Sequence, residues 1–172
     1  MSDDALPAER RVLERLGHLP LDFRAMGVVS NLFRASTAIR RHMEATILAP
    51  DKLSWTSFVA LWVLWVWGEM ESRDLAAAVG ISRPTSTGVV TTLERRGWVE
   101  RRRSAEDGRM VRVALTAEGE RKIAELFPRF NDEERAVTAQ LTPDQQDAIA
   151  AMLRAMLQSV DRSAVDLDPR EV

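Results

Sequence analysis

The sequence predicts a mainly α-helical fold with a small β wing, an α+β arrangement within one chain of 172 residues. Three observations predict it. Apolar residues recur at three- and four-residue spacing along most of the chain, which is typical of amphipathic helices. Two segments that alternate apolar and charged residues flank Asp107-Gly108, a pair typical of hairpin turns. The hydrophobic content of 45% is ordinary for a protein that buries a core.

Two helices are expected before the first strong break. Residues 1–21 read as an N-terminal extension, in which Ala8 to Leu16 can form a short helix. Residues 22–50 are expected to hold a long helix with a broken apolar stripe, which runs to about Leu48. Pro50 ends it, because the residue before a proline resists helical geometry.

The next two helices differ in character. Ser54 is a good cap for a helix over Trp55–Trp67, which is apolar nearly all round and must be covered on more than one side. A short helix over Ser72–Val79 follows, with Asp74 near its positive end.

A tight turn leads from this short helix into another. Gly80 can take the left-handed conformation, Ser82 can cap the new helix, and Pro84 falls in its first turn. Gly97 closes the helix. The chain therefore contains a helix-turn-helix.

A charged hairpin follows the turn. Trp98–Arg103 and Met110–Leu115 are the expected strands, with Val111, Val113 and Leu115 on one side of the second. Helix, turn, helix and ribbon in this order place one helix in a DNA major groove and a basic hairpin over the flanking backbone. Residues 51–116 are thus predicted to form a winged helix-turn-helix DNA-binding domain.

Two more helices are expected over residues 117–165, before a tail at 166–172. Thr116 caps the first, which reaches about Gln140, and Thr142-Pro143 begins the second. These helices and the long N-terminal helix have apolar faces that a small winged helix does not need. A homodimer interface built from both chain ends explains them better than a second lobe of one subunit.

Positive charge is concentrated in one segment. Residues 82–112 contain eight arginines against four acidic residues, a net charge of +4, whereas the whole chain has −2, which leaves −6 for the rest. A basic patch on an acidic body suits binding of a polyanion through one face.

Other classes of function are disfavoured. Without cysteine and with only two histidines, the chain is not expected to hold a disulfide, a thiolate centre or a metal site. It has no phosphate loop and no nucleophile elbow, so we expect no catalytic residues, no cofactor and no enzyme activity. It also shows no signal-peptide core and no apolar run of membrane-spanning length, so a cytoplasmic protein is expected.

The run from Asp107-Gly108-Arg109 to Thr116-Ala117-Glu118-Gly119, with LAAAVGIS and LERRGWVERR before it, resembles the MarR family of winged-helix transcriptional regulators. The likeness extends over roughly residues 22–160. It implies a homodimer with intertwined terminal helices, a recognition helix over about Arg83–Arg96 and a wing over about Arg103–Met110. Glu71 departs from the Ser or Thr cap often found in the family, and the first twenty residues lie outside the likeness.

The recognition helix is expected to present polar side chains to base edges, since arginine can bond guanine and a threonine methyl can meet thymine. In the family pattern, Arg109 reaches the minor groove and Asp107 holds the wing. Arg101, Arg102, Arg103 and Arg112 are candidates for phosphate contacts. The blander alternatives are a solvated helix face and a charged surface hairpin. The predicted DNA-binding residues are Ser82, Arg83, Thr85, Ser86, Thr87, Thr91, Arg95, Arg101, Arg103, Asp107, Arg109 and Arg112.

Tryptophans cluster on the apolar helix. Tryptophans at helical spacing are more often core than ligand site, yet the resemblance implies a crevice here in which small aromatic or phenolic ligands bind and weaken DNA binding. Such a slot would suit a planar organic acid. The candidate ligand residues are His42, Trp55, Trp62, Trp65 and Arg73.

The leading interpretation is a homodimeric regulator, most often a repressor in such families, that binds a pseudo-palindromic operator and is released by a small aromatic or phenolic ligand. Two alternatives remain: a regulator with no effector, and a winged-helix module that binds an acidic protein.

Overall fold

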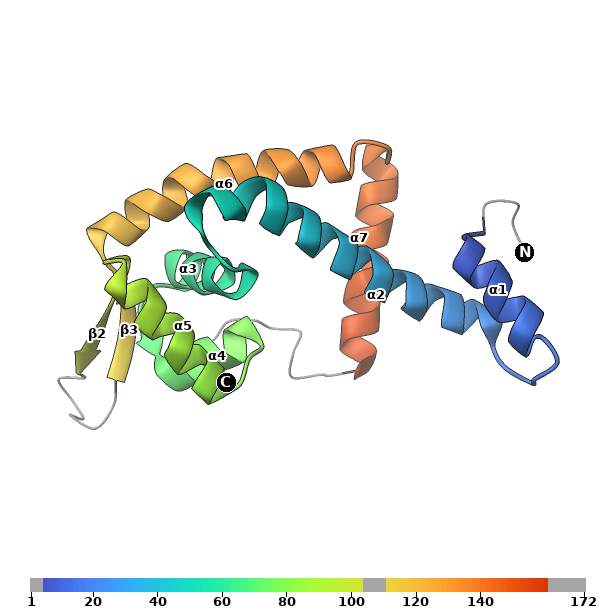
Figure 1. The fold of residues 1–172 in the computed structure, drawn as a ribbon, viewed down its shortest axis with the longest axis horizontal. Coiled ribbons are helices and arrows are strands. Elements are labelled where there is room, and N and C mark those ends of the chain that lie inside the picture. The colour runs from blue at the N-terminus through green and yellow to red at the C-terminus, as the bar shows by residue number, and fades with distance from the viewer. Residues whose placement is uncertain (1–4, 104–110, 161–172) are drawn as a thin grey trace. The chain divides into compact units, whose positions relative to one another are not determined.

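The structure is a computed structural model that describes residues 5–103 and 111–160. The chain divides into an N-terminal unit, Met1–His42, and a second unit, Met43–Val172. Most described residues are helical, with one small antiparallel sheet, which confirms the predicted fold class (Figure 1).

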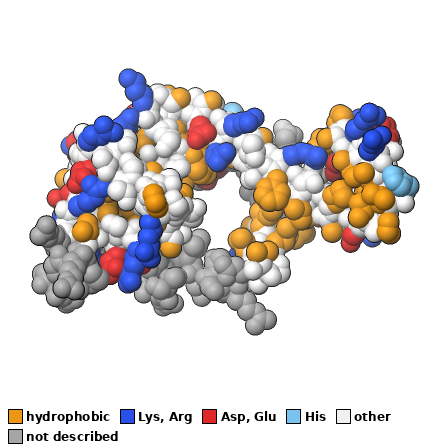
Figure 2. Space-filling view, turned by 60° about the horizontal axis from the view of Figure 1, so that its bottom comes forward, with side chains coloured by type: hydrophobic (Ala, Val, Ile, Leu, Met, Phe, Trp, Pro, Cys, Tyr) orange, Lys and Arg blue, Asp and Glu red, His pale blue; other side chains and the backbone are white. Residues whose placement is uncertain are grey.

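The N-terminal unit consists of α1 (Pro7–Leu16) and most of α2 (Phe23–Met43). The carboxylate of Glu9 joins them: it accepts from the backbone N–H of Leu6 at 2.7 Å and from Nδ2 of Asn31 at 2.8 Å. These two hydrogen bonds, that from Leu6 first, hold the pKa of Glu9 below its ordinary value. Apolar side chains gather at the surface of this unit (Figure 2). The exposed ones are Leu6, Leu19, Leu21, Val28, Val29, Leu32, Phe33 and Ile39.

The end of the long helix is wound differently from its body. A π-helical turn, η1 (Glu44–Leu48), and a 3₁₀ turn, η2 (Ala49–Asp51), follow α2 directly. Met43, Ile47 and Leu48 are buried there, so these turns anchor the second unit's core. The helix was predicted to run to about Leu48, and helical structure does continue to that point.

The central helix is α3 (Trp55–Trp67), which packs against α4, α5, α6 and β3. The predicted cap is present, because Oγ of Ser54 accepts from the N–H of Ser57 at 3.2 Å. Coverage on several sides, as expected for an apolar helix, lets most of α3 join the core. Among the most deeply buried large side chains of this core are Leu48, Leu61, Leu75, Leu93, Ile123 and Leu126.

The helix-turn-helix consists of α4 (Ser72–Val79) and α5 (Arg83–Arg95). Gly80 has φ 72° and ψ 36°, the left-handed conformation that the sequence predicted. Oγ of Ser82 accepts from the N–H of Thr85 at 3.3 Å, which caps α5. Glu71 precedes α4 and makes no side-chain cap.

The sheet has three strands, whereas the sequence predicted two. Its order is β1 (Met70–Glu71), β3 (Val111–Leu115) and β2 (Val99–Arg103), all antiparallel. A strand of two residues shows no alternation, so β1 left no signal in the sequence. Burial along β3 does not simply alternate with its two faces. Val113 and its neighbour Ala114 are both buried, while Val111 is exposed. The helices α3, α4 and α6 all contact β3.

The last helices are α6 (Ala117–Val137) and α7 (Pro143–Val160). Oγ1 of Thr116 accepts from the N–H of Gly119 at 3.0 Å, as predicted. Thr142 and Gln145 form the predicted reciprocal capping box, with bonds of 2.9 and 3.3 Å. No residue of α7 is buried within the described chain. The apolar side chains that it exposes are Ile149, Met152, Leu153, Leu157 and Val160.

Candidate nucleic-acid interface

Helix α5 has one core face and one solvent face. Ser86, Val90 and Leu93 are buried and share the core face because they are three and four residues apart. Ser86 was expected to point outward, and this is wrong: only 3% of the residue is exposed. Ser86 lies one helical turn before Val90, on the core face of α5, where it cannot contact DNA.

The solvent face of α5 carries a stripe at four-residue spacing: Arg83, Thr87, Thr91 and Arg95, all exposed. Thr85, also exposed, lies with Oγ1 2.8 Å from Oγ of Ser82. The guanidinium groups of Arg83 and Arg95 form no hydrogen bond or ion pair with any other residue that the structure describes, although the carbonyl of Arg83 accepts from Oγ1 of Thr87 at 3.0 Å. They are therefore available to an external anion.

Arg101, by contrast, is held by the protein. From β2, Arg101 donates to Oγ1 of Thr91 at 2.8 Å and forms an ion pair with Glu94. Two expected DNA-binding residues, Arg101 and Thr91, are thus bonded to each other. Arg101 ties the first wing strand to the outward side of α5.

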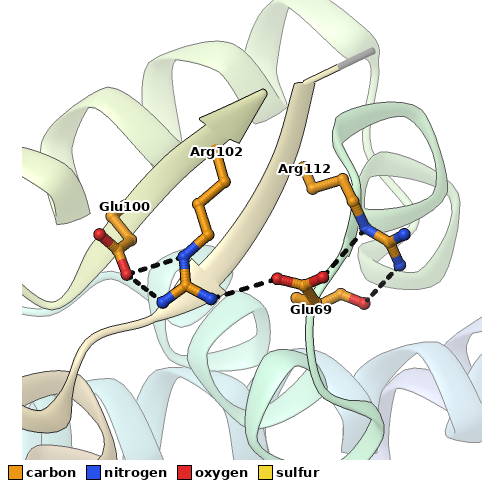
Figure 3. Close-up of polar contacts among 4 residues, drawn as sticks. All are labelled: Glu69, Glu100, Arg102 and Arg112. Carbon is orange, nitrogen blue, oxygen red and sulfur yellow. Dashed lines mark hydrogen bonds and ion pairs between the residues drawn. The ribbon is translucent and has the colours of Figure 1, made fainter. Parts of the chain in front are cut away.

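The base of the wing carries a further ion-pair cluster (Figure 3). Arg102 on β2 pairs with Glu100, and its Nη1 lies 3.4 Å from Oε2 of Glu69. Nε of Arg112 lies 3.4 Å from the other carboxylate oxygen of Glu69. Bonding to Glu100 raises the pKa of Arg102 above its ordinary value. These arginines are therefore partly neutralised before any DNA is bound.

The tip of the wing cannot be compared with its prediction. Arg103 ends β2 opposite Val111, while Asp107 and Arg109 lie outside the described residues.

A second cluster fixes the end of α5, and the sequence did not reveal it. The guanidinium of Arg96 donates to the backbone oxygens of Asp51 and Lys52, each at 2.8 Å, and stacks 4.8 Å from the ring centroid of Trp98. Nζ of Lys122 bonds Oδ1 of Asp51 at 2.6 Å. These partners are 44 to 71 residues apart in sequence, so no local spacing could have predicted them.

Helices α3 and α6 line an open cavity of about 240 Å³. We call it the aromatic cavity. The rings of Phe58 and Phe130 stack with centroids 4.2 Å apart, and Trp55 lies 5.9 Å from Phe130. The residues that line it are Trp55, Phe58, Val59, Trp62, Phe127, Phe130 and Glu134.

The structure brings together only part of the predicted ligand set. Trp55 and Trp62 line the aromatic cavity, but Trp65 does not: its ring packs against Phe127 at 5.6 Å and the residue is 40% exposed. Arg73 is not brought there either, since its guanidinium pairs with Glu71 and Asp74 beside α4. His42 is an exposed residue of α2 in the N-terminal unit. The expected basic partner for an organic acid is therefore not supplied by Arg73.

Among the described residues, no group of histidine, cysteine and acidic side chains could hold a metal ion. Within the same residues, no helix combines the length and apolar character that crossing a bilayer would require.

Comparison with known proteins identifies relatives of the whole fold. The profile of the MarR family matches residues 53–111. An uncharacterised HTH-type transcriptional regulator of Bacillus subtilis, YwaE, is 36% identical over 149 residues, which span 85% of this chain and 87% of that protein. The transcriptional repressor MprA of Escherichia coli is 29% identical over 56% of this chain and 55% of its own length.

Among solved structures, BpsR of Bordetella bronchiseptica matches with a TM-score of 0.68 and 29% identity. The match covers 76% of this chain and 98% of BpsR, whose DNA binding is regulated by 6-hydroxynicotinic acid.

Proposed function

The chain belongs to the MarR family of DNA-binding transcriptional regulators, and on this premise we propose that it is a homodimeric repressor of a pseudo-palindromic operator that a small aromatic effector releases. Its relatives are regulators rather than enzymes. As a regulator of chromosomal DNA, it would act in the cytoplasm.

Operator binding is best supported by a difference among the arginines around α5: some are paired within the protein and others are not. Arg101, Arg102 and Arg112 are paired within the protein, whereas Arg83 and Arg95 stand on the solvent stripe without a partner among the described residues. An unpaired arginine on a recognition helix can give two hydrogen bonds to guanine. We therefore assign base contact to Arg83, together with Thr85 and Thr87, and phosphate contact to Arg95.

Exposed apolar surfaces support the homodimer. Phe33 on α2 is 68% exposed and Met152 on α7 is 62% exposed, although both lie on otherwise regular amphipathic helices. Each helix exposes several apolar side chains, and exposed apolar surface of this kind is typical of an interface. Two copies joined through these helices would present two α5 helices to neighbouring half-sites.

The aromatic cavity supports an effector. It lies between α3, which packs directly against α4 and α5, and α6, which continues toward α7. A ligand that separates α3 from α6 would change the spacing of two α5 helices in a dimer, and fixed half-sites would then lose contacts. Ligand and operator would weaken each other reciprocally.

The test begins with genomic fragments selected by the purified protein and an operator defined from them. Arg83→Ala should weaken operator binding by ~1–3 kcal/mol. The matched control is Arg11→Ala, a change at an exposed arginine of α1, which should leave affinity unchanged. A reporter carrying the operator should be repressed by the protein, and addition of the effector should relieve that repression.

Two outcomes would contradict the proposal. Displacement by any competitor DNA with equal ease would show that binding is not sequence-specific. A protein that stays monomeric at the concentrations where it binds operator would contradict the homodimer.

A further inference from the structure

The aromatic cavity has an unusual balance of charge for a site expected to take an organic acid. Five of its lining residues are aromatic, Val59 is apolar, and the remaining one is Glu134. None of the lining residues that the structure describes is basic. The carboxylate of a ligand that enters this cavity would lose hydration, and no basic side chain would compensate for that loss. The cavity therefore disfavours anions.

A second carboxylate lies next to the same rings. Oε1 of Glu44 accepts from the backbone N–H of Trp55 at 3.2 Å, so its charge sits at the end of α3 where the Trp55 ring lines the cavity. Oε2 of Glu134 accepts from Nδ2 of Asn131 at 2.9 Å. Glu134 is thus held in position among the lining residues, and Glu44 is held at the backbone of Trp55.

The basic side chains of α6 that might oppose these acids are directed elsewhere. Nη1 of Arg129 lies 3.9 Å from Oδ2 of Asp51, and Arg135 pairs with Asp132 at 2.9 Å. Glu134 is the one charged residue among the described residues that line the cavity, and Glu44 lies at the backbone of Trp55.

The aromatic rings of the cavity also favour a positively charged ligand. Trp55 is tilted by 46° to Phe130 and by 53° to Phe58, so the rings form walls at different angles rather than one stack. Aromatic walls with negative faces attract ammonium groups, and tryptophan is the strongest of them. Aromatic rings together with an acid are the usual means of recognising a substituted ammonium ion.

We propose that the effector bound in the aromatic cavity is an organic cation, a substituted ammonium on an apolar or aromatic body, whose charge contacts Trp55, Trp62 and Glu134. This inference rests on the proposed function, because it takes the cavity as the effector site. It makes this chain a sensor of hydrophobic amines rather than of aromatic acids.

The test uses three probes that share a benzyl group and differ in charge: benzyltrimethylammonium, benzyl alcohol and phenylacetate. Binding to the full-length protein is measured by calorimetry. The cation should bind at least about tenfold more tightly than phenylacetate, which corresponds to ~1.4 kcal/mol. Phenylacetate binding as tightly as the cation, or no binding of the cation, would overturn the proposal.

Glu134→Gln provides the variant, because Glu134 is exposed and its amide counterpart can still accept from Asn131. It should weaken benzyltrimethylammonium about fivefold, of the order of one cation contact, and leave benzyl alcohol unchanged. Glu125→Gln, on an exposed residue of α6 that does not line the cavity, is the matched control and should change neither. Equal effects of the two variants would show that general surface charge, and not the cavity, selects the cation.

Operator binding is measured separately with the same protein. If the wild type fails to bind any operator but keeps its preference for the cation, the regulator function is wrong and the ligand class stands. If it binds an operator and prefers phenylacetate, only the ligand class is wrong.

Discussion

Arg102 and Arg112 lie directly opposite each other across the antiparallel β2–β3 pair, and the carboxylate of Glu69 contacts both (Figure 3). Like charges in direct opposition destabilise a sheet. Glu69 offsets this repulsion from the segment between α3 and β1, and it thereby ties the base of the wing to that segment.

Glu69→Gln should expose that repulsion. We expect the free energy of unfolding to fall by about 0.5–1 kcal/mol, since the pairs are partly exposed. Arg112 would lose its carboxylate partner, whereas Arg102 keeps Glu100, so the salt dependence of DNA binding should steepen by about one unit, roughly one per phosphate contact. Urea titrations and affinities at several salt concentrations measure both. Glu118→Gln, which disrupts an exposed pair with Arg121, is the control, and an equal change there would refute the special role of Glu69.

Gly88 should be a position where α5 gains stability from a side chain. It is exposed inside the helix, and an added Cβ would have nothing within 4 Å. Gly88→Ala should therefore stabilise the protein by about 1 kcal/mol, through helix propensity alone. If the backbone at Gly88 approaches the DNA closely, operator affinity should fall while the melting temperature rises. A melting temperature that does not rise would contradict the first expectation.

Gly119 should show the opposite behaviour for the same change. An added Cβ would lie 1.9 Å from the backbone oxygen of Trp98, so the start of α6 would have to move. Gly119→Ala should lower the free energy of unfolding by ~1–3 kcal/mol or more, as overpacking does. Denaturant titration beside Gly88→Ala measures it, and a neutral effect would show that the Thr116–Gly119 turn is not closely packed.

The N-terminal unit should depend on pH through Glu9. Because its pKa is lowered by the bonds from Leu6 and Asn31, its contribution is present above the ordinary carboxyl range and is lost as the pH falls through the lowered value. The protection of the α1 amides from hydrogen exchange, taken relative to the intrinsic exchange rate at the same pH, should fall on acidification below about pH 4. In Glu9→Gln the exchange rate of α1 should no longer respond to this group, and an unchanged acid response in that variant would assign the effect elsewhere.

Sequence reasoning succeeded where the relevant interaction is local. The turn at Gly80 and the caps by Ser54, Ser82, Thr116 and Thr142 join residues no more than a few positions apart, so residue type and spacing were enough. The burial of Ser86 was also within reach, because it follows from the period that places Val90 and Leu93 inward.

What the sequence by itself determined is the order of the elements, their caps and the excess of arginine around α5. The tertiary structure alone decided which of those arginines form ion pairs within the protein and which acid lines the aromatic cavity. Glu69 meets Arg102 and Arg112 from 33 and 43 residues away, and Phe130 joins Phe58 from another helix. Such contacts depend on how packed elements bring distant residues within a few ångströms, because Coulomb and dispersion forces act through space and not along the chain.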